Sequence, residues 1–483
     1  MGLKQKALSG IKWTSVSSLI SAIVQLVQLS ILAHYLEASD FGLIAIVNMI
    51  IGFSFLFLDL GISASIIHKQ DITHAQLSSL YWLNIASGLF LFIIIYSLAP
   101  IMANFYNETE LIPIIRLLAT SFIIFSLGSQ YGVLFQKALK FNLMAKISII
   151  SAVLGLIVAV TSAMNGYGVY ALVYASLVSA VVVSSINIYM GIKEHRPSFV
   201  FKYHEITSMI SFGIFQMGEK SINYFNSQFD VILIGKLLGV EALGIYSVAK
   251  NISVKPFKAI NPIITKVTFP MMSKVQNDIG RLKNIFLKTM KYLASVNFPI
   301  YILIIILAEP IVLILFGEKW TDSIVILQVL AAYRMFTAIG NPIGVLQLAK
   351  GRADLGFYWN LGLFFIIPIT IYVGSYWGLL GIVYSLLGLQ FVLFFPGWKL
   401  LVNPLCGARL KEYSLQIFKP LILSMVGGIL AYGGSLLFGI ENMYLNAGLM
   451  TVLMGIVVLV LNVWFNREFI ATFFEFVRKR KKN

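Results

Sequence analysis

The 483-residue chain is poor in charge and in cysteine, and it lacks the motifs of soluble enzymes. Charged residues make up 12% of it, against about 25% in ordinary soluble domains. With one cysteine, Cys406, the chain cannot form an intramolecular disulfide. It contains no P-loop, no H-E-x-x-H motif and no cysteine/histidine ligand cluster. These absences exclude a soluble enzyme, a disulfide-stabilised domain, and a pump with its own ATPase domain.

Long apolar runs dominate the chain instead. Hydrophobic residues make up 59% of it, and its mean hydropathy is +0.87. Runs of about 20 apolar residues, the length a helix needs to cross hydrocarbon, alternate with short polar turns. The sequence therefore predicts an all-α integral membrane protein of about fourteen transmembrane helices, with no separate soluble domain. We expect the spans at 11–34, 41–67, 77–99, 113–135, 146–164, 169–192, 207–235, 243–267, 288–307, 325–349, 355–373, 379–401, 417–438 and 446–465.

The loops between these spans alternate regularly in charge. Loops on one side are rich in lysine and arginine, as at 137–146 and 193–202, whereas loops on the other side carry mostly Asp and Glu. Basic loops stay in the cytoplasm, so we expect both termini there. These basic loops also account for the net charge of +16, and no nucleic-acid partner is expected.

A faint internal repeat relates two stretches of the chain, 31–47 and 233–249, at an offset of 202 residues. Gly42 and Gly244 occupy equivalent positions in it. An even number of spans separates the copies, so both run in the same direction. The repeat predicts two pseudo-symmetric six-helix lobes around a central cavity, related by an axis along the membrane normal. The expected parts are an N-lobe at 1–206, a C-lobe at 207–411, and a helix pair with a basic tail at 412–483.

The longest cytoplasmic loop, about 268–287, combines apolar residues at helical spacing with basic ones. We expect it to form an amphipathic helix lying on the inner membrane surface. Its apolar residues are Ile279, Leu282, Ile285 and Phe286, and its basic neighbours are Arg281, Lys283 and Lys288.

The span at 243–267 carries three lysines, Lys250, Lys255 and Lys258, in its body. A lysine at the centre of a bilayer costs about 2.5–3.5 kcal/mol, so three facing lipid would cost about 8–10 kcal/mol. They must therefore face water, a partner or a ligand. At about 100° per residue they occupy one broad face of the helix. Lys220 and Arg334 lie at similar depth in neighbouring spans.

These five basic residues outnumber by three the two carboxylates counted against them, Glu219 and Asp230. The surplus predicts a cationic cavity that binds an anion such as phosphate, pyrophosphate or an acidic sugar. A structural role remains open for some of the cations. Lys220 can pair with Glu219 or Asp230, and Lys250 can extend toward a membrane surface.

Amide side chains in the same spans suit sugar hydroxyls, although they also join transmembrane helices to one another. The candidate glycan contacts are Gln25, Gln28, Asn223, Asn226 and Asn251. The candidates for coupling transport to protons or sodium are Asp59, Glu219 and Asp230. For Asp59 a helix cap or a salt bridge is the alternative. We expect no catalytic residue, no metal and no organic cofactor.

Several segments, in this order, resemble the polysaccharide transporter family. They are FLDLGISASIIHKQDITHAQLSSLYWLN (57–84), GVLFQKALKF (132–141), GYGVYALVYASL (166–177), LGVEALGIYSVAKNI (238–252), FGEKWTDSIVILQVLA (316–331) and NPIGVLQLAKGRADLGFYWN (341–360). Members export lipid-linked O-antigen, colanic acid and teichuronic acid repeat units. The family belongs to the multidrug/oligosaccharidyl-lipid/polysaccharide exporter superfamily, which includes the toxin-extrusion transporters and the lipid II flippase.

The resemblance implies a V-shaped pair of lobes that opens alternately to the two sides of the membrane. It implies a flippase for undecaprenyl-pyrophosphate-linked oligosaccharide in a bacterial inner membrane. The positions that fit the family's cationic cavity are Lys220, Lys250, Lys255, Lys258 and Arg334. The expected partners are this lipid-linked oligosaccharide, membrane lipids, a polysaccharide polymerase and a chain-length regulator.

Three other functions compete with this one. A drug exporter of the same superfamily is disfavoured, because cationic drugs need acidic cavities. A membrane polymerase or ligase usually carries catalytic residues on a long outside loop, and here those loops are short. A scaffold in an assembly complex would leave the lysines in the spans without a purpose.

Overall fold

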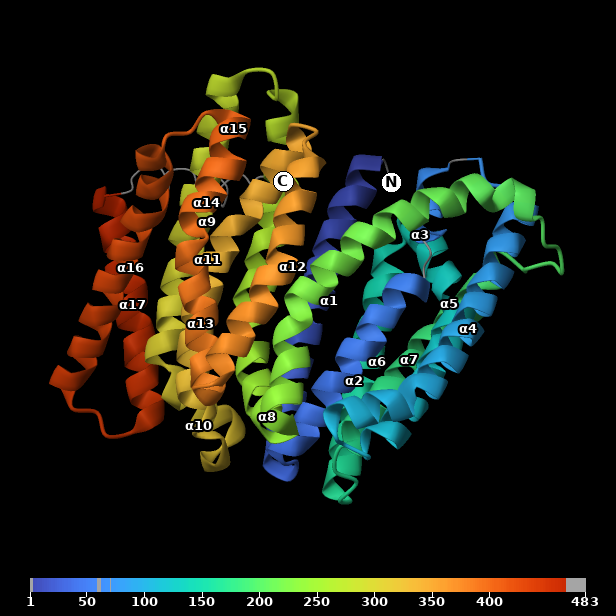
Figure 1. The fold of residues 1–483 in the computed structure, drawn as a ribbon, viewed down its shortest axis with the longest axis horizontal. Helices are drawn as coiled ribbons and strands as arrows, with labels where there is room; N and C mark the ends of the chain where they lie inside the picture. The colour runs from blue at the N-terminus through green and yellow to red at the C-terminus, as the bar shows by residue number, and fades with distance from the viewer. Residues whose placement is uncertain (1–2, 59–61, 70, 466–483) are drawn as a thin grey trace. The chain divides into compact units, whose positions relative to one another are not determined.

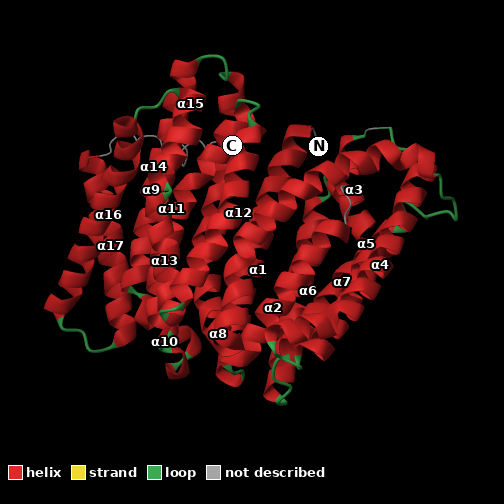
Figure 2. Ribbon diagram, in the orientation of Figure 1, coloured by secondary structure: helices red, strands yellow, loops and turns green. Residues whose placement is uncertain are grey.

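The structure is a computed structural model, and it describes residues 3–465 except 59–61 and 70. Within these residues the chain consists of helices joined by short loops, with no strand (Figure 2). Thirteen described helices are long and apolar enough to cross a membrane. One of them, Lys220–Lys274, is 55 residues long and covers two of the predicted spans. The predicted all-α membrane fold of about fourteen spans is thus confirmed.

The helices pack into two compact units, Met1–Gly244 and Ile245–Asn483 (Figure 1). The first unit contains α1 (Leu3–Tyr35), α2 (Ala38–Leu58), α3 (Ile62–His68), α4 (His74–Tyr106), α5 (Leu111–Lys137), α6 (Phe141–Met164) and α7 (Tyr170–Gly191). The second unit contains α9 (Ile279–Ile306), α10 (Ala308–Phe316), the 3-10 turn η1 (Glu318–Trp320), α11 (Ser323–Ala349), α12 (Ala353–Ser375), α13 (Gly378–Val392), α14 (Phe394–Gly397), the π-helical turn η2 (Trp398–Val402), α15 (Asn403–Cys406), α16 (Leu410–Phe438) and α17 (Met443–Phe465).

The long helix α8 (Tyr203–Lys274) crosses the boundary between the units. Its backbone is non-helical at Gly239, where φ is 87° and ψ is 174°. A side chain is strained at such a positive φ, so glycine is the residue that allows α8 to break there into two arms. The three-part division predicted from the repeat, at 1–206, 207–411 and 412–483, stays a prediction.

Small residues set how closely the helices of the first unit approach one another. α4 packs on α5, and α5 packs on α7. A Cβ atom added at Gly88 would lie 2.6 Å from Ser126 Cβ, and one added at Gly128 would lie 2.6 Å from Ser184 Cα. Because lipid gives apolar helices no hydrophobic reason to associate, close backbone packing of this kind holds membrane helices together.

Two glycines of the internal repeat form a reciprocal contact between α2 and α8, within the first unit. A Cβ atom at Gly42 would lie 1.8 Å from the carbonyl oxygen of Val240. A Cβ atom at Gly244 would lie 1.7 Å from the carbonyl oxygen of Ala38. Positions 38 and 240 are separated by the same 202 residues as positions 42 and 244. Each copy of the repeat therefore places its glycine against the first turn of the other copy.

The linker between α7 and α8 is tied to the start of α4. The Trp82 indole N–H donates to the carbonyl oxygen of Ser198 at 2.8 Å. His195 of the linker is buried, and its ring centroid lies 4.6 Å from that of His74. Burial, together with the neighbouring His74, lowers the pKa of His195. Burial therefore favours the neutral imidazole of His195.

Helix α9 lies at the centre of the second unit, between α11 and α16. Its first turns correct one expectation, because the amphipathic surface helix predicted at 268–287 is wrong. α8 continues to Lys274 and α9 begins at Ile279, so the segment forms the ends of two transmembrane helices. Leu282 and Phe286 are fully buried, and the Phe286 ring lies parallel to that of Tyr413 at 6.4 Å. The segment is helical as expected, but Leu282 and Phe286 of its apolar face pack on protein.

Candidate substrate-binding site

The three lysines of the predicted site lie on the second arm of α8, in the second unit. Lys250 and Lys255 are half-buried, and Lys258 is exposed. Lys255 and Lys258 are one turn apart on the helix, so they are surface neighbours. Lys250 Nζ lies 5.8 Å from the ring centroid of Tyr246, a cation–π distance. The helix therefore presents basic side chains along three turns, from partly buried to exposed.

Helix α9 fixes the backbone of α8 between these lysines. Tyr301 is fully buried, and its hydroxyl donates to the carbonyl oxygen of Ser253 at 3.1 Å. Ser253 is also fully buried, and its hydroxyl donates to the carbonyl oxygen of Lys250 at 3.0 Å. Pro256 removes a backbone donor in the next turn, which leaves a carbonyl of α8 without its helical partner. Tyr301 of α9 thus stabilises a part of α8 in which the helix has lost one of its own backbone hydrogen bonds.

A second polar contact holds α8 one turn beyond Lys258. Asn261 is 1% exposed, and its Nδ2 donates to the carbonyl oxygen of Ala338 in α11 at 2.7 Å. Its Oδ1 accepts from Nδ2 of Asn297 in α9 at 3.3 Å. Because amides buried in a membrane protein are costly unless hydrogen-bonded, this network specifies the rotation of α8 about its axis. That rotation decides where the three lysines point.

Arg334 lies in the middle of α11 and is half-buried. Its guanidinium carbon is 5.3 Å from the ring centroid of Tyr333. Its Nε is buried and has no hydrogen-bond partner in the part of the chain that the structure describes. Tyr301, which binds α8 at Ser253, also interacts electrostatically with Arg334. Tyr301 thus interacts both with Arg334 and with the stretch of α8 between Lys250 and Lys255. We call Lys250, Lys255 and Lys258 the lysine face.

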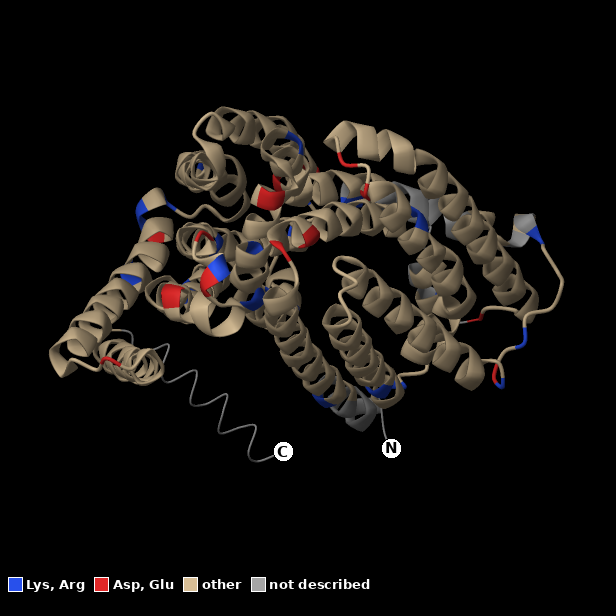
Figure 3. Cartoon of the chain, turned by 90° about the horizontal axis from the view of Figure 1, so that it is seen from below, with Lys and Arg blue, Asp and Glu red and all other residues tan. Residues whose placement is uncertain are grey.

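The spans of the second unit contain few carboxylates. In the described part of this unit, every Asp and Glu lies in a loop, at a helix cap or in the first turn of a helix. Lys250, Lys255, Lys258 and Arg334 lie well inside their helices. Figure 3 shows the charged residues as small red and blue segments among mostly uncharged ribbon. Within its helices the described part of the second unit therefore carries more basic than acidic side chains.

The predicted residues on the first arm of α8 belong to the first unit. Lys220 and Asn223 are exposed, and Asn226 is half-buried. The side chain of Glu219 lies outside the described residues. Asp230 is 8% exposed, and its Oδ1 accepts the backbone N–H of Val231 at 2.8 Å. The structure therefore places Lys220 and Asp230 in a different unit from the lysine face.

The remaining predicted residues are less informative. Gln25 is exposed and Gln28 is half-buried on α1, which packs against α6. Asn251 is exposed, and its Nδ2 donates to the carbonyl oxygen of Ser247 in its own helix at 3.0 Å. Asp59 lies outside the described residues. Their roles as glycan contacts or in ion coupling stay predictions.

The structure adds three residues that the sequence reasoning missed, namely Ser253, Asn297 and Tyr301. Asn297 and Tyr301 are four positions apart, so both lie on one face of α9. Two polar residues on one face of an otherwise apolar span could have identified this contact from the sequence. They were missed because the search for site residues in this span considered ionisable side chains. In the described residues, no group of three or more His, Cys, Asp or Glu side chains is placed to hold a metal ion.

Comparison with other proteins gives the family. The chain matches the family described as "Polysaccharide biosynthesis protein" over residues 31–325. It is 35% identical over 443 residues to the teichuronic acid biosynthesis protein TuaB of Bacillus subtilis (strain 168), which covers 90% of each chain. It is 30% identical over 433 residues to the lipopolysaccharide biosynthesis protein WzxC of Escherichia coli (strain K12), covering 89% of this chain and 88% of the other.

The fold is similar to that of solved transporters. An inward closed conformation of the lipid II flippase MurJ superposes with a TM-score of 0.77 at 15% identity, covering 95% of this chain and all of that chain. An inward-facing multidrug resistance MATE family transporter gives a TM-score of 0.61 at 16% identity, covering 81% and 97%. The sequence matches confirm the resemblance to polysaccharide transporters, and the chain therefore belongs to the polysaccharide biosynthesis protein family, as a multi-pass membrane protein.

Proposed function

We propose that this protein is a flippase that moves undecaprenyl-pyrophosphate-linked oligosaccharide across the bacterial inner membrane by alternating access. Its curated relatives are named for teichuronic acid and lipopolysaccharide biosynthesis. Its fold is shared with a lipid II flippase, which is named for a lipid-linked substrate. In this proposal the lysine face of α8 and Arg334 bind the pyrophosphate.

The observation that carries the proposal is the excess of basic over acidic residues within the helices of the second unit. A pyrophosphate brings concentrated negative charge and several acceptor oxygens, which lysine and arginine bind through charge-assisted hydrogen bonds. In a site with little water these bonds are stronger than at an exposed surface. The undecaprenyl chain is apolar and needs no protein cavity, because it can remain in the bilayer.

The gradation of exposure along α8 fits a transported anion better than a permanently bound one. Lys258 is exposed, whereas Lys255 and Lys250 are half-buried. A substrate that meets Lys258 first can pass to Lys255, one turn away, and then to Lys250, which lies five residues further along the helix. Each step exchanges one cationic partner for another, so the pyrophosphate is never left without a counter-charge.

The test replaces the lysines one at a time in cells. Lys255→Ala and Lys258→Ala should each reduce surface polysaccharide and cause lipid-linked repeat units to accumulate in the inner leaflet, at unchanged protein level. The matched control is Lys266→Ala, an exposed lysine on the same arm of α8 but two turns beyond Lys258. Lys258→Arg should keep export, since the charge and the phosphate-binding capacity remain.

The proposal fails if both alanine variants export polysaccharide as the wild type does. It also fails if the purified protein moves cationic dyes across vesicles, because that result would identify a drug exporter. Lipid-linked units that accumulate in the outer leaflet of a strain without the protein would point instead to a polymerase or ligase acting after the flip.

Energy coupling is a separate part of the proposal. The candidates for ion coupling are Asp59, Glu219 and Asp230. Of these, the structure describes the side chain of Asp230, which is buried. A buried carboxylate can exchange a proton as its surroundings change. Flipping by Asp230→Asn in vesicles should respond less than wild type to an imposed proton or sodium gradient. Wild-type flipping that ignores both gradients would remove this part of the proposal alone.

A further inference from the structure

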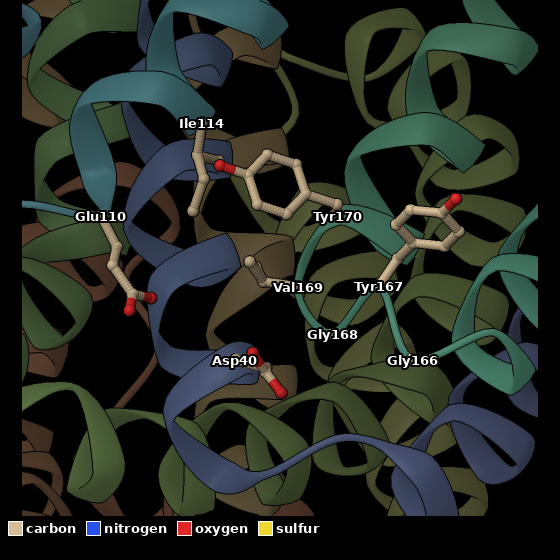
Figure 4. A pocket seen from close by; sticks show the side chains of 8 residues that line it. All are labelled: Asp40, Glu110, Ile114, Gly166, Tyr167, Gly168, Val169 and Tyr170. Atoms are coloured by element: carbon tan, nitrogen blue, oxygen red, sulfur yellow. The ribbon is translucent and has the colours of Figure 1, made fainter.

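A cavity of about 340 Å³ lies at one end of the first unit, where the α1–α2, α4–α5 and α6–α7 connections meet (Figure 4). We call it the outer cavity, because these connections are expected outside the cytoplasm. Its size is at the low end of the range of about 300–1,000 Å³ that is typical of small-molecule sites. The side chains that define it are Asp40, Glu110, Ile114, Tyr167, Val169 and Tyr170.

The lining of the outer cavity is rich in hydrogen-bond acceptors. Asp40 lies in the first turn of α2, and Glu110 directly precedes α5. In the view of Figure 4 both carboxylates lie below the ring of Tyr170, which points toward Ile114. None of the lining residues is Lys, Arg or His. A cavity with two carboxylates and no cation repels phosphate and carboxylate ligands, so its ligand must instead supply hydrogen-bond donors.

A metal cation fits this cavity poorly. Three helices, α2, α5 and α7, begin at its wall, and their N-terminal ends carry partial positive charge. Asp40 Oδ2 already accepts the backbone N–H of Glu37 at 2.9 Å. In the described residues the two carboxylates belong to no group of three or more acidic, histidine or cysteine side chains placed for a metal. The donors that remain are those of uncharged groups, the hydroxyl and amide groups that sugars carry.

The cavity also has the shape features of a sugar site. Tyr170 offers an aromatic ring and a hydroxyl, and the C–H face of a pyranose packs on such a ring. Gly166 and Gly168 of the α6–α7 loop have φ values of +78° and +50°, which disfavour larger residues there. A Cβ atom at Gly166 would meet no atom within 4 Å, so this side of the loop is open.

We propose that the outer cavity binds one neutral sugar residue of the oligosaccharide. Asp40 and Glu110 accept its hydroxyl groups, and Tyr170 packs against its ring. The assignment of the sugar to the transported oligosaccharide rests on the proposed function. The cavity is too small for a whole repeat unit, so it holds a terminal sugar. The outer cavity prefers an uncharged ligand, whereas the lysine face prefers an anion. In this proposal the outer cavity therefore recognises the sugar end of the substrate and the lysine face its pyrophosphate end.

The aromatic belt of a membrane protein does not explain these features. The ring centroid of Tyr174 lies 6.1 Å from that of Tyr167 and 6.0 Å from that of Tyr170. Such a group of tyrosines is typical of a belt at the membrane interface. A belt accounts for exposed rings, but it does not account for two carboxylates and an open volume beside one of them. Tyr174 does not line the cavity and therefore serves as a control.

The test measures binding of methyl glycosides to the purified full-length protein in nanodiscs, by saturation-transfer NMR. The probes are methyl glucoside, methyl N-acetylglucosaminide and methyl glucuronide, with calcium chloride in a separate thermal-shift arm. The variant Asp40→Asn/Glu110→Gln keeps the shape and an acceptor for the Glu37 N–H but removes both charges. We expect it to bind neutral glycosides about tenfold more weakly, because hydrogen bonds to ionised acceptors are roughly twice as strong as neutral ones.

The controls are Glu108→Gln, a neighbouring carboxylate outside the cavity lining, and Tyr174→Phe. Both should bind like the wild type, and Tyr170→Ala should not. Any saturation-transfer signal of methyl glucuronide should be the same in the wild type and in Asp40→Asn/Glu110→Gln, because the outer cavity should not bind an anionic sugar. The proposal is overturned if no neutral glycoside binds, if binding is unchanged in the double variant, or if calcium stabilises the protein through these two carboxylates.

Failure of the outer cavity and failure of the proposed function can be told apart. If wild-type protein flips lipid-linked oligosaccharide in vesicles but binds no neutral glycoside, only the outer cavity is wrong. If glycoside binding depends on Asp40 and Glu110 but no flipping is seen, the proposed function is wrong and the sugar site remains. Lys255→Ala should leave glycoside binding unchanged.

Discussion

The reciprocal glycine contact between α2 and α8 allows a prediction whose sign is informative. Replacing Gly42 by Ala places a Cβ atom 1.8 Å from the carbonyl oxygen of Val240. Restoring a separation of 3.0 Å requires the backbone of α8 to retreat by at least 1.2 Å. The obstructing atoms are backbone rather than a flexible side chain, so no rotamer change relieves the clash.

The magnitude follows from two opposing terms. Overpacking of this kind costs about 1–3 kcal/mol, and occasionally more. Glycine to alanine in a helix interior gains about 1 kcal/mol from backbone entropy. The clash at Gly42 is with backbone atoms, which places its cost toward the upper end of that range, so we expect a net loss of about 1–2 kcal/mol. At Gly388 in α13, where an added Cβ would meet no atom within 4 Å, the same substitution should be neutral or stabilising.

Thermal unfolding in detergent, followed by size-exclusion chromatography, measures the effect. Gly42→Ala and Gly244→Ala should each lower the apparent Tm, and Gly388→Ala should not. The two contacts share one gap, since both lie between α2 and α8. Widening that gap once makes room for both methyl groups, so the double variant should cost less than the sum of the single variants. A Gly42→Ala protein as stable as Gly388→Ala would refute the close approach.

Two further predictions concern buried polar groups. In the folded protein the pKa of His195 lies below its ordinary value of 6.5. Below about pH 6.5 the unfolded chain therefore binds a proton that the folded chain does not, so the free energy of unfolding should decrease as the pH is lowered. His195→Asn should flatten the decrease in Tm between pH 7.5 and about 5.5, whereas the exposed His34→Asn should retain it. Asn261→Leu should destabilise the protein by about 1–3 kcal/mol, because the carbonyl of Ala338 loses its donor. The same variant should impair flipping if the rotation of α8 positions the lysines, and normal flipping would show that it does not.

The fold could be predicted from run lengths and loop charges because a membrane leaves few alternatives. Backbone groups in hydrocarbon must be satisfied within the segment, so an apolar run of sufficient length forms a helix. The helix break near Gly239 was also visible in the sequence, as a short polar turn. What the sequence could not provide was the partner of each helix face, since this depends on packing between distant segments.

The segment 268–287 shows why such a partner is hard to predict. An apolar stripe beside basic residues is expected both for a helix on a membrane surface and for the end of a helix inside a bundle. The stripe fixed the helical period correctly, but the ring of Tyr413, more than a hundred residues away, decides which surface it meets. Local periodicity carries no information about that contact.

The candidate site was predictable in part for the same reason. Lysines in a span are unusual enough to identify α8 from sequence alone. Tyr301 and Asn297 are uncharged and inexpensive by comparison, so nothing singled them out. Their importance lies in the atoms that they bind, Ser253 O and Asn261 Oδ1, which belong to another helix.

The glycine contact also bears on the ancestry of the chain. Residues i and j of one copy touch residues j and i of the other, which is the pattern of an interface across a two-fold axis. A shorter ancestral protein with one copy of the repeat would make this contact as a symmetric dimer, with each glycine fitting the partner's first turn. Fusion of two such genes would then free the copies to diverge, one keeping few charges and the other acquiring lysines. The glycines would be what remains of the dimer.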